Sequence, residues 1–277
     1  MADLHFLANP ARFRRFSQRV MPSLAFATVL ALAVGLYFAL VQSPPDYQQG
    51  ETVRIMFVHV PSAWLAMLGY GLLAVLGAAL LVWRHPLAAL MARASAPVGA
   101  CFALVCLLTG SLWGRPMWGT YWVWDARLTS MLLLFFLYLG HIALSRAYDD
   151  SDRGDRAAAI LALVGVINLP IIKFSVDWWN TIHQPASVAR LGGPSIHPTI
   201  LVPLLWMAVA LLLLFVLLAT SSFLYLELSA VFRPAAADAL MTKLRNWLDT
   251  HQEQVIIVIS LLLGFWLAGK SLYLLIT

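Results

Sequence analysis

Long runs of apolar residues, separated by short polar segments, dominate this chain. Six runs are long enough to cross the roughly 30 Å hydrocarbon core of a bilayer as helices. They cover residues 21–42, 57–83, 97–113, 128–146, 157–175 and 198–228. A seventh run, at 255–276, is also long enough but carries Lys270. The pattern predicts an all-α, polytopic integral membrane bundle with six core transmembrane helices and a seventh at the C-terminus.

The composition supports a membrane protein rather than a soluble one. Hydrophobic residues make up 61% of the chain and charged residues only 11%, a balance far from that of soluble domains. The first apolar run is too long for the apolar part of a cleavable signal peptide. We therefore expect it to remain in the protein as the first span.

The net charge of +5 comes mainly from basic residues in short segments between the apolar runs. If the N-terminus is cytoplasmic, twelve of the eighteen basic residues lie on the cytoplasmic side, as the positive-inside rule requires. The outer side then holds Arg54, Arg115, Arg127, Lys173 and Arg190, and the eighteenth, Lys270, lies near the outer end of the last run. This distribution favours contact with membrane lipid, not nucleic acid, and predicts outer segments at 43–56, 113–127 and 174–197.

Six of the eleven tryptophans fall in two of these outer segments. The stretch 113–128, WGRPMWGTYWVWDARL, contains Trp113, Trp118, Trp122 and Trp124, and the stretch 175–185 adds Trp178 and Trp179. One interpretation is an aromatic belt at the lipid headgroups, but a belt needs only one or two aromatics at each helix end. Four in a loop broken by glycine and proline favour a flat apolar surface for a large planar ligand.

Two of the seven histidines, His59 and His183, lie near these tryptophans and on the same predicted side. A single histidine is more often structural, but two imidazoles on one membrane face can serve as axial ligands of one haem iron. Arg54 and Arg127 lie on that side too. Their guanidinium groups can hold the two haem propionates through charge-assisted bonds; contact with lipid headgroups is the alternative.

Several motifs together resemble the CcmC family, the haem-delivery subunits of the bacterial system I cytochrome c maturation machinery. The motifs are DYQQG, RIMFVHVPSAW, WGRPMWGTYWVWDARLT and NLPIIKFSVDWWNTIHQ. The tryptophan-rich stretch is similar to the WWD signature of haem-handling proteins. CcmF and the fused systems of other bacteria also carry this signature, but their chains are much longer. The resemblance covers roughly residues 10–233.

The resemblance implies that haem b is held at the outer, periplasmic face of the bacterial inner membrane. Its two ligands would be His59 and His183, one before and one after the WWD segment. It also implies delivery to the haem chaperone CcmE, which bonds covalently to a haem vinyl group. CcmD would support the complex, and an ATPase of CcmA and CcmB would help release loaded CcmE. Tyr121 stands where the motif often has tryptophan, so a ring remains without an indole N–H.

We therefore interpret residues 1–233 as a CcmC-like WWD haem-handling membrane domain and residues 234–277 as a C-terminal extension. Trp118, Trp122 and Trp124 would form the platform under the ligand, with Trp113 near its edge. Asp125 would orient its loop or cap the next helix, since Asp is a favoured N-cap residue, or else contact the chaperone.

The expected mechanism is binding and handover of haem rather than a catalytic cycle. A membrane b-type cytochrome with bis-histidine haem, acting in electron transfer, is the main alternative function. Such a site usually has both histidines inside spans, whereas His183 is predicted in a loop. A transporter or lipid-modifying protein with an interfacial tryptophan loop is a further alternative.

Overall fold

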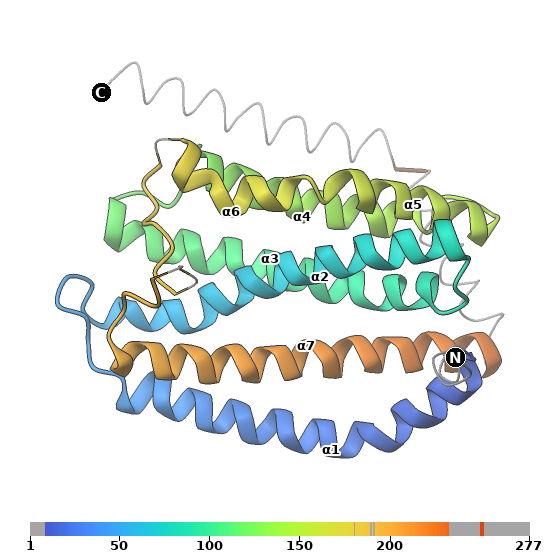
Figure 1. The fold of residues 1–277 in the computed structure, drawn as a ribbon, viewed down its shortest axis with the longest axis horizontal. Helices are drawn as coiled ribbons and strands as arrows, with labels where there is room; N and C mark the ends of the chain where they lie inside the picture. The colour runs from blue at the N-terminus through green and yellow to red at the C-terminus, as the bar shows by residue number, and fades with distance from the viewer. Residues whose placement is uncertain (1–8, 180, 189, 191, 233–249, 252–277) are drawn as a thin grey trace. The chain divides into compact units, whose positions relative to one another are not determined.

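The computed structural model describes residues 9–179, 181–188, 190, 192–232 and 250–251. This part of the chain contains a succession of helices (Figure 1). They are α1 (Pro10–Tyr37), η2 (Phe38–Gln42), η3 (Glu51–Ile55), α2 (Met56–Trp83), α3 (Ala88–Trp118), α4 (Ala126–Leu144), α5 (Ser151–Gly165), α6 (Asn168–Trp178) and α7 (Pro198–Phe232). Among the described residues, β-pairing is limited to one isolated bridge between Asp46 and Gly50. The predicted all-α class is confirmed.

Six helical stretches in the described residues are long and apolar enough to cross a membrane. They are Pro10–Gln42, Glu51–Trp83, Ala88–Trp118, Ala126–Leu144, Ser151–Trp178 and Pro198–Glu227. Each corresponds to one of the six predicted core spans, so that part of the prediction is confirmed. The predicted seventh span at 255–276 lies outside the described residues.

Local sequence signals explain where several helices begin. The Asn9 side chain accepts a hydrogen bond from the N–H of Ala11 at 2.9 Å, and Pro10 occupies the first helical position of α1. Asp150 similarly accepts from the N–H of Asp152 at 3.0 Å and caps α5. These side chains satisfy N–H groups that have no partner within their own helix.

Helices α2, α3, α4 and α5 pack around a core that contains two tyrosines. Tyr138 of α4 donates to the carbonyl of Ala66 in α2 at 2.7 Å, and Tyr70 of α2 donates to the carbonyl of Leu161 in α5 at 3.2 Å. The two rings meet edge to face, 5.1 Å apart. A Cβ at Gly99 of α3 would lie 2.3 Å from the Tyr138 hydroxyl, so only glycine allows this approach between helices.

Helix α1 lies beside α7 (Figure 1). Phe13, near the start of α1, meets Phe223 near the end of α7 at 4.9 Å between ring centroids. Phe38, just after α1, stacks on Trp206 in the first part of α7 at 6.3 Å. These two contacts show that the helices run antiparallel.

The fifth predicted span is interrupted rather than continuous. Helix α5 ends at Gly165, and α6 begins at Asn168. Pro170 has no backbone N–H to continue the hydrogen bonding of the preceding turn. The Asn168 side chain is buried at this break and donates to the carbonyl of Ser130 in α4 at 2.8 Å, which ties the interrupted span to its neighbour.

Helix α3 is longer than predicted. The third span was expected to end at residue 113, but α3 continues to Trp118. Pro116 removes only one hydrogen bond near the end of the helix. The helix stops at Gly119, whose φ of 75° is the left-handed conformation in which many helices terminate. Trp113 and Trp118 are therefore helical residues.

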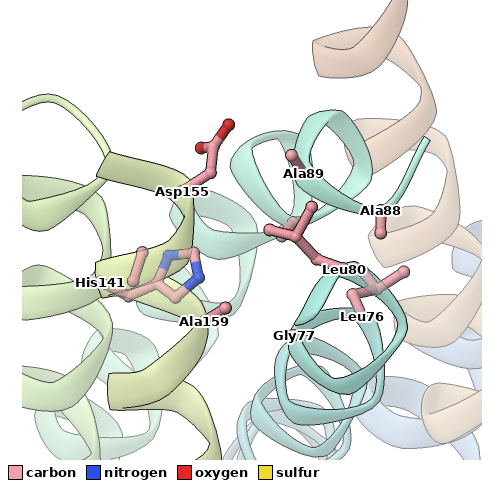
Figure 2. A pocket seen from close by; sticks show the side chains of 10 residues that line it. Leu76, Gly77, Leu80, Ala88, Ala89, His141, Asp155 and Ala159 are labelled. Atoms are coloured by element: carbon pink, nitrogen blue, oxygen red, sulfur yellow. The ribbon is translucent and has the colours of Figure 1, made fainter. Parts of the chain in front are cut away.

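A small cavity lies at the end of the bundle where α2 ends and α3 begins (Figure 2). His141 of α4 and Asp155 of α5 line it together with leucine, glycine and alanine residues of α2, α3 and α5. Asp155 is also ion-paired with Arg93 at 2.6 Å. The free volume of the cavity, about 10 Å³, admits about one water molecule. The cavity is therefore too small for a large planar ligand.

Candidate functional site

The residues singled out in the sequence gather at the other end of the bundle. Helix α2 begins there, α3 ends, and α4 begins, and the segment between α6 and α7 also lies at this end (Figure 1). His59 comes from the first turn of α2, Asp125 stands just before α4, and His183 comes from the segment after α6. Residues far apart in the chain thus share one end of the bundle.

The His59 ring is held against α3. Its Nδ1 lies 3.0 Å from the carbonyl oxygen of Cys106 and 3.1 Å from the hydroxyl oxygen of Thr109. Trp113, one turn further along α3, meets the ring edge to face with centroids 5.7 Å apart. A Cβ at Gly110 would lie only 2.8 Å from Cε1 of the imidazole. The absence of a side chain at Gly110 therefore lets His59 approach α3 this closely.

These contacts define the tautomer of neutral His59. A carbonyl oxygen can only accept a hydrogen bond, so Nδ1 must donate to Cys106. The Thr109 hydroxyl donates to the carbonyl of Val105 at 2.6 Å, which leaves its oxygen as an acceptor for the same Nδ1–H. The proton is therefore on Nδ1, and Nε2 of His59 keeps a free lone pair for a ligand.

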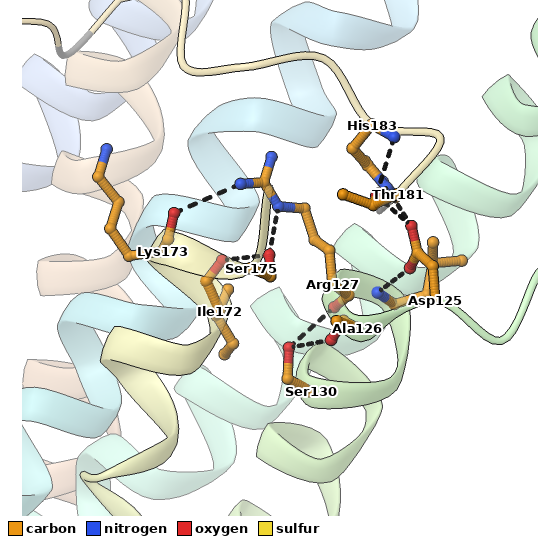
Figure 3. A network of polar contacts seen from close by, with 10 residues as sticks. Asp125, Ala126, Arg127, Ser130, Ile172, Lys173, Ser175, Thr181 and His183 are labelled. Atoms are coloured by element: carbon orange, nitrogen blue, oxygen red, sulfur yellow. Dashed lines mark hydrogen bonds and ion pairs between the residues drawn. The ribbon is translucent and has the colours of Figure 1, made fainter. Parts of the chain in front are cut away.

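His183 is held by a carboxylate rather than a carbonyl (Figure 3). Its Nδ1 lies 2.9 Å from Oδ2 of Asp125, and its side chain is 18% exposed. The Thr181 hydroxyl accepts from the backbone N–H of His183 at 3.0 Å and donates to the same Oδ2 at 2.5 Å. Trp118 meets the imidazole with ring centroids 4.9 Å apart. The segment that carries His183 is thereby fastened to the start of α4.

Asp125 is the N-cap of α4, which confirms the predicted capping role. Its Oδ1 accepts from the N–H of Leu128 at 2.8 Å. Burial by itself raises the pKa of this carboxyl, but the hydrogen bond from Thr181 and that from Leu128 lower it. The hydrogen bond from His183 and its charge act in the same direction, so the pKa of Asp125 is below its usual value. The side chain is therefore an ionised acceptor at neutral pH.

The two imidazoles and one arginine are electrostatically coupled. Burial lowers the pKa of His183; the hydrogen bond and charge of Asp125 oppose this, while the charge of Arg127 adds to it. The net result is a lowered pKa, so His183 is mainly neutral at pH 7. His59 lies within electrostatic range of both His183 and Arg127. The structure thus places the two predicted ligands in one small region.

Arg127 is attached to α6, whereas Arg54 is attached to its own helical turn. The Nε of Arg127 donates to the Ser175 hydroxyl at 3.2 Å and one terminal nitrogen donates to the carbonyl of Lys173 at 3.4 Å (Figure 3). These bonds use two of the five guanidinium N–H groups. Arg54 forms an ion pair of 2.5 Å with Glu51. The assignment of both arginines to propionates stays a prediction.

The four clustered tryptophans are divided between a helix and the segment that follows it. Trp113 and Trp118 lie on α3, and the Trp113 indole donates to the Gln49 side chain at 3.0 Å. Trp122 and Trp124 lie between α3 and α4 and meet edge to face at 5.4 Å. The indole N–H of Trp122 is buried and has no acceptor among the described residues. Such a donor is costly unless a ligand or solvent supplies an acceptor.

Several residues that hold the site were not singled out by their individual chemistry. They are Gln49, Cys106, Thr109, Gly110, Thr181 and Ser175, all of which touch or support predicted site residues. Gln49 was contained in the DYQQG motif, which gave a signal for it. The others are common residue types whose role depends on contacts with distant segments, and their spacing carried no signal.

The sequence of this chain matches a known protein family. The family model of CcmC, described as "Heme exporter protein C", matches residues 3–225. A second model, that of the sulfolipid-1-addressing protein Sap, matches residues 204–273, which is less than half of the chain.

Curated relatives match most of the chain. "Heme exporter protein C" of Bradyrhizobium diazoefficiens is 63% identical over 76% of this chain and 80% of the relative. The proteins of the same name from Haemophilus influenzae and Escherichia coli are 50% and 49% identical, over 73% and 76% of this chain and over 82% and 85% of the relatives. All of the predicted site residues lie within residues 3–225, the range that the family model matches. The chain therefore belongs to the CcmC family of heme exporter protein C.

Proposed function

We propose that this chain binds haem b at the periplasmic face of the bacterial inner membrane and delivers it to the chaperone CcmE for cytochrome c biogenesis. Membership of the CcmC family supports a role in haem handling for cytochrome c maturation. The six apolar helices support a multi-pass membrane location. The excess of basic residues in the other loops supports a cytoplasmic N-terminus and a periplasmic site.

The proposal rests mainly on one property that the two histidines share, which is an Nδ1 that faces a hydrogen-bond acceptor. Each Nδ1 is engaged by an oxygen acceptor, Cys106 for His59 and Asp125 for His183. Each neutral imidazole therefore has its Nε2 lone pair available, as an axial ligand of iron requires. These two nitrogens would be the ligands that the chain offers to the iron of bound haem.

The aromatic residues next to the histidines are suited to contact the planar ring of haem. Trp118 contacts His183, and Trp113 contacts His59, so each proposed ligand has an indole beside it. Trp122 and Trp124 add further ring surface and one buried N–H donor. Stacked or edge-on rings contribute on the order of 0.5–1.5 kcal/mol per contact beyond their buried area, which would add to the iron bonds in holding a planar ligand.

The position of His183 favours handover over electron transfer. It lies in the segment between α6 and α7, not within a span. Trp118, which contacts its ring, is 37% exposed, and Trp124 is 48% exposed. A site with exposed walls lets a partner reach the cargo, whereas electron transfer does not require the cofactor to leave. CcmD and the CcmA/CcmB ATPase are the further partners that the family membership suggests for this proposal.

The decisive experiment follows haem between two purified proteins. The chain is isolated in detergent, loaded with haem, separated from free haem and mixed with haem-free CcmE, and the visible spectrum of each protein is recorded after separation. Transfer of the Soret band to the chaperone supports delivery. A stable band that stays with the chain and only changes with redox state supports the b-type cytochrome, and the lack of any band contradicts both.

The ligand assignment is tested with His59→Ala and His183→Ala. Each variant is expected to lose most of its bound haem while staying in the membrane, because the imidazole–iron bonds are the main specific attachment and neither side chain is needed for insertion. A matched control is His197→Ala, an exposed histidine at the start of α7. If both site variants keep the haem spectrum of the unmodified protein, the assignment is wrong.

A further inference from the structure

Asp125 uses its two carboxylate oxygens for two different tasks. Oδ1 accepts from the N–H of Leu128 at 2.8 Å and starts α4. Oδ2 accepts from the Thr181 hydroxyl at 2.5 Å and faces Nδ1 of His183 at 2.9 Å. The Asp125 side chain is only 5% exposed. The carboxylate is therefore held in one orientation by the helix on one side and by the His183 segment on the other.

This geometry determines which nitrogen of His183 carries the proton. Both oxygens of Asp125 already accept hydrogen bonds, from Leu128 and from Thr181, so the carboxylate offers His183 an acceptor and no donor. Nδ1 must then be the protonated nitrogen, and Nε2 keeps its lone pair. Without Asp125 the ring could adopt the other tautomer, in which Nε2 is protonated and cannot bind a metal.

The two proposed ligands differ in the acceptor behind them. His59 donates to a neutral backbone carbonyl, that of Cys106, whereas His183 donates to a carboxylate. A carboxylate behind a ligating imidazole fixes the tautomer and ring orientation and raises the basicity of the metal-binding nitrogen. The Nε2 atom of His183 is therefore the stronger electron donor of the pair.

We propose that Asp125 is a positioning residue for His183: it holds the imidazole in the Nδ1–H tautomer and makes His183 the stronger of two unequal haem ligands. The part of this inference that concerns iron rests on the proposed function. The part that concerns the tautomer is a property of the haem-free chain, and it can be tested alone.

The substitution Asp125→Asn reverses the hydrogen bond without removing the cap. Asparagine is as good an N-cap as aspartate, and the N–H of Leu128 requires an oxygen acceptor. The amide oxygen must therefore stay at the Oδ1 position, which turns the NH₂ group toward His183. A donor there pairs with an unprotonated Nδ1 and favours the tautomer with the proton on Nε2. Asp152→Asn is the control, since it removes an exposed carboxylate near the start of α5, away from the His183 segment.

The first measurement uses haem-free protein with ¹⁵N-labelled histidine in lipid bilayers. The ¹⁵N shifts of His183, identified by their loss in His183→Ala, report which nitrogen is protonated. We expect the Nδ1–H tautomer in the unmodified chain and in Asp152→Asn, and a shift toward Nε2–H in Asp125→Asn. An unmodified chain with Nε2–H, or an Asp125→Asn variant that keeps Nδ1–H, overturns the proposal whether or not the chain binds haem.

The second measurement uses the haem-loaded protein. Asp125→Asn is expected to weaken haem binding by about 10- to 100-fold, to raise the reduction potential of the remaining bound haem, and to move its spectrum from six-coordinate toward five-coordinate iron. Asp125→Glu, which restores a carboxylate, should recover part of the affinity. Unchanged affinity and potential in Asp125→Asn overturn the ligand part. A chain that binds no haem in any variant contradicts the proposed function but leaves the tautomer result standing.

Discussion

Gly110 allows a specific prediction because it packs against a proposed ligand, His59, and has no side chain of its own that could bind haem. A Cβ at this position would lie 2.8 Å from Cε1 of His59. That is about 0.7 Å closer than the lower limit of about 3.5 Å for a favourable carbon–carbon contact. The ring cannot simply move away, because its Nδ1 is bonded to Cys106 at 3.0 Å and Trp113 packs against it. Gly110→Ala must therefore displace the imidazole or strain α3.

The size of the effect follows from this steric conflict. Overpacking a well-packed region costs about 1–3 kcal/mol. If this cost must be met for His59 to bind iron in its present position, haem affinity falls by about 5- to 150-fold, at about 1.4 kcal/mol for each factor of ten. The same substitution at Gly71 of α2 is a control. Its Cβ would meet only Leu169, at an ordinary 3.8 Å, so Gly71→Ala should keep the original affinity.

The assay is a titration of purified haem-free protein with haem, followed by the Soret absorbance. The amount of each variant in the membrane fraction is compared first, so that a loss of binding is not a loss of protein. We expect weaker binding for Gly110→Ala and unchanged binding for Gly71→Ala. Equal affinities for both variants and the unmodified chain would refute the claim that glycine is required beside His59.

Two further predictions concern the aromatic platform and the C-terminal extension. Replacing Trp118, Trp122 or Trp124 by Ala should weaken haem retention by on the order of 0.5–1.5 kcal/mol beyond the lost buried area. The triple variant should lose haem or fail to load the chaperone. If the triple variant transfers haem at the normal rate, these rings are only an aromatic belt at the membrane interface. A chain truncated after residue 233 should still bind haem, because every proposed site residue lies upstream, and loss of haem from a correctly inserted truncated chain would contradict this. A reporter enzyme active only in the cytoplasm, fused after Thr277, should be inactive if the run 255–276 crosses the membrane, whereas activity would exclude the seventh crossing.

Much of the fold was predictable because membrane spans are a local property of the chain. The length of each apolar run sets whether a helix can cross the bilayer, and all six core spans are present in the described residues. The N-cap role of Asp125 was predictable for the same reason, since a cap acts within one turn of its helix. The end of α3 was predicted less well, since the third span was expected to end at residue 113 and the helix continues to Trp118, where Gly119 terminates it.

The candidate ligands could be chosen from the sequence, but their surroundings could not. His59 and His183 were recognisable as histidines beside tryptophan-rich stretches that resemble a known motif. The residues that hold them are far away in the chain: Cys106 is 47 positions from His59, and Asp125 is 58 positions from His183. Such contacts depend on how each helix is rotated and crossed against its neighbours, which apolar periodicity does not determine.

The sequence alone therefore determined the class of protein and its core spans, and it suggested the residues of the candidate site, because hydrophobic length and motif identity are properties of consecutive residues. Only the tertiary structure decided which nitrogen carries the proton in each proposed ligand. It placed a backbone carbonyl behind His59 and a carboxylate behind His183, and it brought Gly110 against the His59 ring. The proton position on an imidazole is set by the acceptor that faces it, and that acceptor is supplied by packing between distant helices and loops.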